Sequence, residues 1–301
     1  GTDPVVCVTG THARLPLLPH DGICDFAIFS DVMFGDGEWV SSSSRGKLDN
    51  FLKTAEKSNA TVFMLSFPAK MEKEMRQFLS SSAAVELIRA YATRRIRGYG
   101  FARVEITDGG SDFPSDYADA LHLLNTAMKS AVSTGGVSLI GMQLRPRKAG
   151  KFGDLHLPKE IVRKVNLFII ISHTLVQGPT DCKVQPISSW TTEHLNDATL
   201  LPLSAALNVV KEGKDENTTF ALSLSLGALN FQVAAPSVAG MDGVWNIACS
   251  QTVLESYEQV CREPLTLGAV GVDDLIVYDF SKKTKTWRSY ETAEVIRKKV
   301  R

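Results

Sequence analysis

The stretch GFARVEIT, residues Gly100–Thr107, is a short run rich in apolar and β-branched side chains, which is typical of a β-strand. Residues with the spacing of an amphipathic helix precede it over Lys70–Ala92 and follow it over Ser115–Ser133. A strand that stands between two helices in this way predicts a βαβ unit, whose strands pair in parallel. We therefore expect Gly100–Thr107 to be one strand of a parallel sheet.

The same alternation extends to both sides of this unit. Further helical patterns lie at Lys47–Ser58 and Leu200–Lys211. The other predicted strands are Val5–Thr9, Cys24–Val32, Thr61–Ser66, Val137–Leu144, Val165–Ser172 and Phe220–Val233. Because these runs are almost wholly apolar, both faces of the sheet are expected to be covered. So many βα units favour an α/β fold of the (β/α)8 TIM-barrel type over an open doubly wound sheet.

The alternation breaks after Val233. A short helix is predicted at Val253–Cys261, two extended pieces at Leu275–Phe280 and Trp287–Tyr290, and a basic helix at Thr292–Arg301. We therefore predict a barrel over residues 1–233, a small α+β insertion after strand seven over residues 234–290, and a helix preceding strand eight over residues 291–301. Strand eight is expected either to be missing from this chain or to be formed by Leu275–Phe280.

The composition excludes two classes of partner. The 33 Lys and Arg residues balance the 33 Asp and Glu residues, and 44% of the chain is hydrophobic. Binding to nucleic acid depends on clustered positive charge, so it is not expected. No apolar run reaches the ~18 residues that cross a bilayer. We expect a globular protein with a sizeable core and no membrane span.

Several features point to an extracellular protein. The chain starts at Gly1 without an initiator Met, which we interpret as a mature N-terminus after removal of a signal peptide. Two sequons predict glycosylation at Asn59 and Asn217, each just before a predicted strand and so at the amino end of the barrel.

The five cysteines contain no CxxC pair, which argues against a zinc ribbon or a thioredoxin-like motif.

The segment GFARVEITDG, residues Gly100–Gly109, followed by Asp116-Tyr117 and Leu121–Met128, resembles strand four and helix four of glycoside hydrolase family 18. This family contains the chitinases and the chitinase-like lectins, whose strand four carries DxxDxDxE after Gly-Phe. Other stretches are similar in the same order: VVCV (Val5–Val8), CDFAIFSDV (Cys24–Val32), VNLFIIISHTLVQGP (Val165–Pro179), LSLGALNF (Leu224–Phe231), LESYEQVC (Leu254–Cys261) and TWRSYETAEVIRKKV (Thr286–Val300). The resemblance covers nearly the whole chain.

The resemblance implies that catalysis has been lost. The family's four acidic positions are occupied here by Ala102, Glu105, Thr107 and Gly109. The last position holds the acid that protonates the glycosidic oxygen, and glycine has no proton to donate. The implied function is a secreted, non-enzymatic chitinase-like binding protein, whose partner is a carbohydrate or an extracellular protein. The alternative is an enzyme with a repurposed pocket at the top of the barrel that uses Glu105, Asp31 and His173.

The candidate ligand-binding residues are Asp31, Trp39, Glu105, Arg145, His173 and Trp245. If the strand register holds, the two carboxylates and the imidazole lie at the carboxyl end of the barrel. Arg145 opens a basic run after strand five that either meets an anionic glycan or is a solvated loop. The two tryptophans are expected either to be exposed platforms for a sugar or a protein, or to pack their loops onto the barrel. No cofactor is expected, and a metal site is not predicted because no third nitrogen or thiolate ligand is evident.

The resemblance also implies a disulfide between Cys7 and Cys24, because the family often bridges its first two strands. Cys249 and Cys261 are candidates for a second bridge; a bond from Cys261 to a residue beyond strand eight and two free thiols are the alternatives. Cys182 has no assigned partner.

Overall fold

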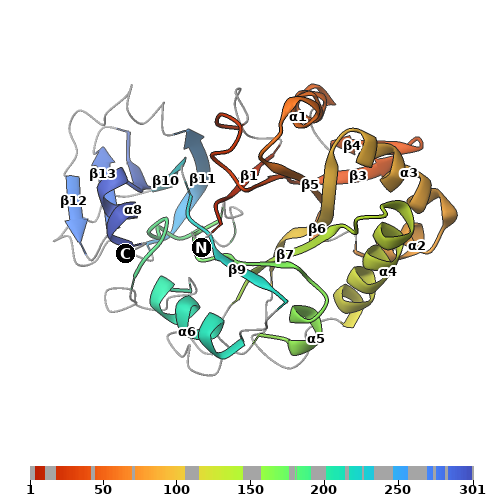
Figure 1. Ribbon diagram of the computed structural model, residues 1–301. Helices are drawn as coiled ribbons and strands as arrows, with labels where there is room; N and C mark the ends of the chain where they lie inside the picture. The colour runs from red at the N-terminus through yellow and green to blue at the C-terminus, as the bar shows by residue number, and fades with distance from the viewer. Residues whose placement is uncertain are drawn as a thin grey trace.

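The computed structural model describes residues 4–10, 18–41, 45–69, 72–105, 115–144, 157–175, 180, 182–190, 201–213, 217–225, 227–233, 247–256, 270–273, 276–281 and 284–299. Within them the chain forms a curved parallel sheet with helices on its outer side and a second, antiparallel sheet at one end (Figure 1).

The parallel sheet has seven strands among the described residues, and its order follows the chain. The strands are β1 (Val6–Thr9), β2 (Phe26–Phe29), β5 (Val62–Ser66), β6 (Ile96–Glu105), β7 (Val137–Gln143), β8 (Leu167–Ile170) and β9 (Thr219–Leu222). Every neighbouring pair is parallel, and β1 and β9 are the two edges. The predicted (β/α) barrel architecture is confirmed, with β6 as its fourth strand.

Helices follow the strands along the outer side of this sheet (Figure 1). They are α1 (Arg45–Lys57), α2 (Glu72–Leu79), α3 (Ser82–Thr93), α4 (Ser115–Ala131), α5 (Lys159–Val162) and α6 (Leu203–Gly213). The single helix expected over Lys70–Ala92 is in fact two. Their junction is at Ser80 and Ser81, whose hydroxyls donate to the carbonyls of Arg76 and Phe78, and such side-chain bonds compete with the helical ladder.

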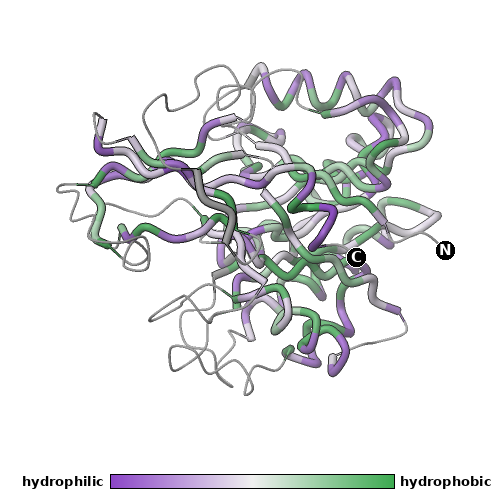
Figure 2. Tube along the Cα trace, turned by 90° about the vertical axis from the view of Figure 1, so that its left-hand side faces the viewer, coloured by the Kyte–Doolittle hydropathy of each residue, from purple (hydrophilic) through white to green (hydrophobic). Residues whose placement is uncertain are grey.

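Two hydrophobic clusters cover the two faces of the parallel sheet. The outer one joins alternate strand residues such as Phe29 and Leu65 to the buried faces of the helices. The inner one lies within the barrel and consists of Ile28, Met64, Ala102, Leu139, Leu167 and Ile169. Figure 2 shows the hydrophobic segments gathered in the strands at the centre, with hydrophilic residues toward the outside of the helices. This arrangement explains the nearly continuous apolar character of the strand sequences.

Strands β6 and β7 approach each other too closely for side chains at two positions. A Cβ atom on Gly100 would lie 1.9 Å from the carbonyl oxygen of Leu139, and one on Gly141 would lie 2.1 Å from that of Ala102. The register of β6 against β7 shifts between Phe101 and Val104. The two glycines therefore permit the irregular pairing that leads into the carboxyl end of β6.

The second sheet has five antiparallel strands in the order β11-β10-β14-β13-β12. They are β10 (Gly227–Val233), β11 (Cys249–Ser256), β12 (Val270–Asp273), β13 (Ile276–Ser281) and β14 (Thr286–Tyr290). Its core includes Phe231, Phe280 and Trp287, with the last two rings stacked at 4.8 Å. The helix α8 (Ala293–Lys299) follows β14. The division into residues 1–233, 234–290 and 291–301 stays a prediction.

Three expectations about strands and helices are wrong. Phe220–Val233 is two strands, because β9 pairs in the parallel sheet while β10 pairs with β11 and β14. Leu275–Phe280 does not form strand eight, because β13 is antiparallel to β12 and β14. The start of the helix expected at Val253–Cys261 belongs to β11 instead.

A fourth correction concerns the end of β2. The strand expected at Cys24–Val32 ends at Phe29. Asp31 then adopts a φ of 62°, in the left-handed region that interrupts an extended strand. The chain continues into the hairpin of β3 (Val32–Gly35) and β4 (Glu38–Ser41). The hairpin therefore forms a separate two-stranded sheet.

Two disulfides lie within the described residues. The expected bridge between Cys7 and Cys24 is confirmed, and it joins β1 to the segment just before its neighbouring strand β2. The pairing of Cys249 with Cys261 is wrong, because Cys249 bonds to Cys182. The amide of Cys249 also donates to the carbonyl of Cys182 at 3.0 Å, so the two backbones already lie side by side. Cys261 lies outside the described residues.

Helix α8 is held by a buried ion pair. Lys299 Nζ lies 2.7 Å from Glu291 Oε1 and 2.7 Å from Ser188 Oγ, and both charged side chains are at most 1% exposed. The Ser188 hydroxyl also donates to the same carboxylate oxygen. Two segments about 100 residues apart in the sequence therefore meet at one charged cluster.

Candidate functional site

The carboxyl ends of the parallel strands carry polar residues on the inner face. Side chains alternate along a strand, so residues two positions beyond an inner apolar residue point inward as well. Leu139 is in the inner cluster, and Gln143 shares its face at the end of β7. Ser30, Ser66, His173 and Ser223 also stand an even number of positions after a residue of the inner cluster or packed against it, namely Ile28, Met64, Ile169 and Ala221. They therefore point inward at this end of the barrel as well. We call these five residues, Ser30, Ser66, Gln143, His173 and Ser223, the polar ring.

The best-defined contact of the polar ring joins His173 and Ser223. His173 Nδ1 lies 2.6 Å from Ser223 Oγ, which also accepts the amide hydrogen of Ser172 at 2.9 Å. Among the described residues the Ser223 hydroxyl has no other acceptor, so we assign it as the donor to Nδ1. The imidazole then carries its hydrogen on Nε2, which makes that nitrogen a fixed hydrogen-bond donor.

The charge state of His173 is also defined by its surroundings. Burial, together with the positive charge of Arg103, lowers the pKa of His173 to about 4. The imidazole is therefore neutral at physiological pH. The backbone holds it in place, because His173 forms an antiparallel bridge with Ser188 and the amide of Thr174 donates to Ile187.

The lowered pKa of His173 predicts a loss of stability in mild acid. The unfolded chain takes up a proton near the ordinary pKa of 6.5, whereas the folded protein does so only near 4. Stability should therefore fall as the pH falls through this window, by about 2 kcal/mol between pH 7 and pH 5. Urea unfolding at both pH values measures the effect. His173→Gln should remove it and His122→Gln, on the exposed side of α4, should retain it; equal pH dependence in both variants contradicts the prediction.

Gln143 contributes an unpartnered polar atom to the polar ring. Its side chain is buried, and its Oε1 has no hydrogen-bond partner within the described part of the chain. A buried carbonyl oxygen without a partner costs free energy unless a ligand or water donates to it. Nearby, Ser66 Oγ accepts the amide hydrogen of Ala102 at 2.6 Å and so satisfies the backbone at the irregular end of β6. An acceptor and a donor, Gln143 Oε1 and His173 Nε2, are thus available at this end of the barrel.

Asp31, Glu105 and His173 do lie at the same end of the barrel, since each ends or follows a parallel strand. The side chain of Glu105 lies outside the described part of the structure, so whether the three side chains meet stays a prediction. Asp31 Oδ2 accepts a hydrogen bond from Ser30 at 3.2 Å, and Glu105 is the last residue of β6, with its backbone in register with Gln143. Ala102 is buried on the inner face of β6. Thr107 and Gly109 lie outside the described residues.

Trp39 is not an exposed platform. It is 2% exposed, with its ring 5.0 Å from that of Phe67 and 5.4 Å from that of Phe78. The hairpin of β3 and β4 turns at Asp36 and Gly37, both with positive φ, and places Trp39 against the barrel. The alternative expectation of loop packing is the correct one. Arg145 and Trp245 lie outside the described residues.

The two sequon asparagines are exposed at the amino end of the barrel. Asn59 precedes β5 and Asn217 precedes β9. The amino end is opposite the polar ring, so a glycan on either residue would leave that end free. Glycosylation of Asn59 and Asn217 stays a prediction.

Ser223 and Gln143 were not among the sequence-based candidates. Gln143 is four positions after Leu139 in the same strand, so its side chain points to the same inner face. This spacing was the sequence signal that could have identified Gln143. Ser223 could not have been found in this way, because the strand containing it was predicted to continue to Val233.

Among the described residues, no group of three or more His, Cys, Asp or Glu side chains could hold a metal ion. In the same part of the chain, no helix has both the length and the hydropathy that a bilayer crossing needs.

No protein-family model matches the chain, and no curated protein matches it. Solved structures do. Human YKL-39, described as a pseudo-chitinase with retained chitooligosaccharide binding, has a TM-score of 0.69 and 12% identity over 99% of this chain and 88% of its own.

Two further solved structures are similar over the same extent. A class V chitinase from Nicotiana tobaccum has a TM-score of 0.68 and 11% identity, over 99% of this chain and 90% of its own. A family 18 N-acetylglucosaminidase from Paenibacillus barengoltzii has a TM-score of 0.68 and 12% identity over the same shares. The chain therefore has the barrel fold of family 18, which both active enzymes and a non-hydrolytic binding protein share.

Proposed function

We propose that this chain is a secreted carbohydrate-binding protein that binds chito-oligosaccharides at the polar ring and does not hydrolyse them. The unpartnered Gln143 Oε1 carries this proposal, because a sugar hydroxyl or amide is a suitable donor to it. His173 Nε2 supplies a complementary donor to a sugar oxygen. YKL-39, which has the same fold, has been solved in the presence of chitooligosaccharides and is described as retaining their binding.

The residues on β6 and beyond it support binding without turnover. Ala102 has no ionisable group, and Gly109 stands where the resemblance to family 18 requires the proton donor. Loss of a general acid removes a factor of ~10²–10⁴ in rate. His173 does not replace it, because an imidazole with a pKa of about 4 is almost entirely unprotonated at neutral pH. The alternative of an enzyme that uses Glu105, Asp31 and His173 is therefore not favoured.

Secretion is the other part of the proposal. Two disulfides fit a protein that folds in an oxidising compartment, and the exposed Asn59 and Asn217 are accessible to glycosylation. Mass spectrometry of the protein from a secreting host, with and without glycosidase treatment, should show glycan at both asparagines.

Calorimetric titration with the tetramer of N-acetylglucosamine tests the binding, alongside an assay for released reducing sugar. We expect saturable binding and no turnover. His173→Ala should weaken the binding about tenfold, because one well-oriented hydrogen bond is lost. His122→Ala on α4 is the matched control and should bind as the parent does. Release of reducing sugar, or no binding of the tetramer, would overturn the proposal.

A further inference from the structure

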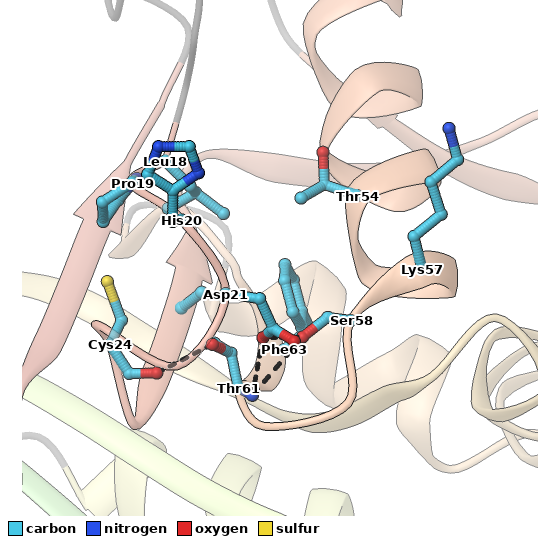
Figure 3. A pocket seen from close by; sticks show the side chains of 11 residues that line it. Leu18, Pro19, His20, Asp21, Cys24, Thr54, Lys57, Ser58, Thr61 and Phe63 are labelled. Atoms are coloured by element: carbon cyan, nitrogen blue, oxygen red, sulfur yellow. Dashed lines mark hydrogen bonds between the residues drawn. The ribbon is translucent and has the colours of Figure 1, made fainter.

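A pocket lies between α1 and the outer face of the sheet, at the amino end of the barrel (Figure 3). It has a volume of about 120 Å3. Its floor is apolar and consists of Leu18, Cys24, Ala27 and Phe63. The polar ring lies at the opposite end of the strands, so the two sites are independent.

The carboxylate in the lining of this pocket is already engaged. The two oxygens of Asp21 accept the amide hydrogens of Asn59, Ala60 and Thr61, and Asp21 also bonds to the Ser58 hydroxyl. These bonds, above all those from Asn59 and Ser58, hold the pKa of Asp21 well below its usual range. Figure 3 shows the carboxylate turned toward Ser58 and Thr61, away from the other side of the pocket. Its charge is therefore directed into the loop before β5.

The opposite rim of the pocket carries nitrogen donors. His20 lies on one side of the opening beside Leu18 and Pro19, and Lys57 lies across from it in the last turn of α1, near Thr54 (Figure 3). The side chains of His20 and Lys57 have no hydrogen bond or ion pair with any other described residue. The hydroxyl of Thr54 donates to the carbonyl of Asn50 within the helix. The rim thus presents the ammonium group of Lys57, which has no ion pair with any other described residue, above an apolar floor.

We propose that this pocket binds a small aromatic carboxylate of about the size of benzoate. A cavity of ~150 Å3 lined by apolar side chains holds one benzene molecule, so the volume here suits a single ring partly open to solvent. The ring packs on Phe63 and Leu18, and the carboxylate lies toward Lys57 and His20 at the rim. Charge complementarity selects the anion over a neutral ring of the same size.

Ligand-observed NMR with benzoate, and with benzyl alcohol as the neutral analogue, tests this site. We expect saturable binding of benzoate with a dissociation constant of about 1 mM, and weaker binding of benzyl alcohol. Lys57→Gln should weaken benzoate about fivefold, because it removes one partly exposed charge contact. Lys53→Gln, on the same helix but outside the lining, is the matched control and should leave the affinity unchanged.

A second variant tests the position of the ligand. Thr54→Phe places a ring at the rim from an exposed helix position and should abolish binding by filling the opening. No saturable binding of benzoate to the parent protein overturns the proposal. Equal affinity in the Lys57, Lys53 and Thr54 variants overturns it as well, as does tighter binding of benzyl alcohol. Chito-oligosaccharide binding at the polar ring is unaffected by any of these results.

Discussion

Lys299→Met is expected to destabilise the folded protein by about 4 kcal/mol. The ammonium group lies in a fully buried ion pair with Glu291, and its removal leaves the carboxylate buried without its counter-charge. Glu291 Oε2 already has no hydrogen-bond partner among the described residues, so in that part of the structure the carboxylate would keep only the neutral Ser188 hydroxyl, on Oε1. Urea unfolding at pH 7 measures the change.

The matched control is Lys298→Met, one residue earlier in α8. Lys298 pairs with Glu294 at 2.8 Å, but both side chains are more than half exposed. Such a pair contributes at most about 0.5 kcal/mol. The double variant Glu291→Leu, Lys299→Met should recover most of the stability, because it removes both charges. If Lys299→Met and Lys298→Met cost the same, the buried pair has no special role.

Gly100→Ala is expected to cost about 3 kcal/mol or more. The added Cβ would lie 1.9 Å from the carbonyl oxygen of Leu139, and a backbone atom cannot move away as the end of a side chain can. Strands β6 and β7 must separate to accommodate it, which weakens the hydrogen bonds of the ladder and the inner cluster. Thermal and urea unfolding both report the loss.

Gly46→Ala provides the control for this variant. Gly46 is exposed in the first turn of α1, and a Cβ there would meet nothing within 4 Å. Alanine at this helical position should stabilise the protein by about 0.5 kcal/mol. A Gly100→Ala variant as stable as the parent would mean that β6 and β7 do not pair as closely as described.

The order of the parallel strands could be predicted because each βα unit has a local signal. The apolar runs at Val62–Ser66 and Leu167–Ile170 stand between helical periods, and both became strands of the barrel. The run Phe220–Val233 was predicted as one strand but forms two strands in different sheets. Nothing local marks the change of sheet after β9, because β10 belongs to the second sheet through its pairing with β14, more than 50 residues later.

The polar ring was only partly predictable for the same reason. His173 was identified because it follows a buried strand. Its partner Ser223 comes from a strand 50 residues away, and their contact depends on the curvature of the sheet. For Trp39 the sequence left exposure and packing of its loop onto the barrel as alternatives. It could not decide between them, because the cluster that buries Trp39 includes Phe67, which follows β5, and Tyr99 in β6.

The cluster of Ser188, Glu291 and Lys299 has a consequence for the order in which the protein is made. Ser188 and Glu291 are 103 positions apart. At a synthesis rate of about 5–20 residues per second, roughly 5–20 s pass between the appearance of the serine and that of the carboxylate. Helix α8 brings the ammonium group, and Lys299 is made eight residues after Glu291. The barrel strands β1 to β8 can therefore assemble on the ribosome before α8 is made, whereas the segment around Ser188 must wait until Glu291 and Lys299 have been made.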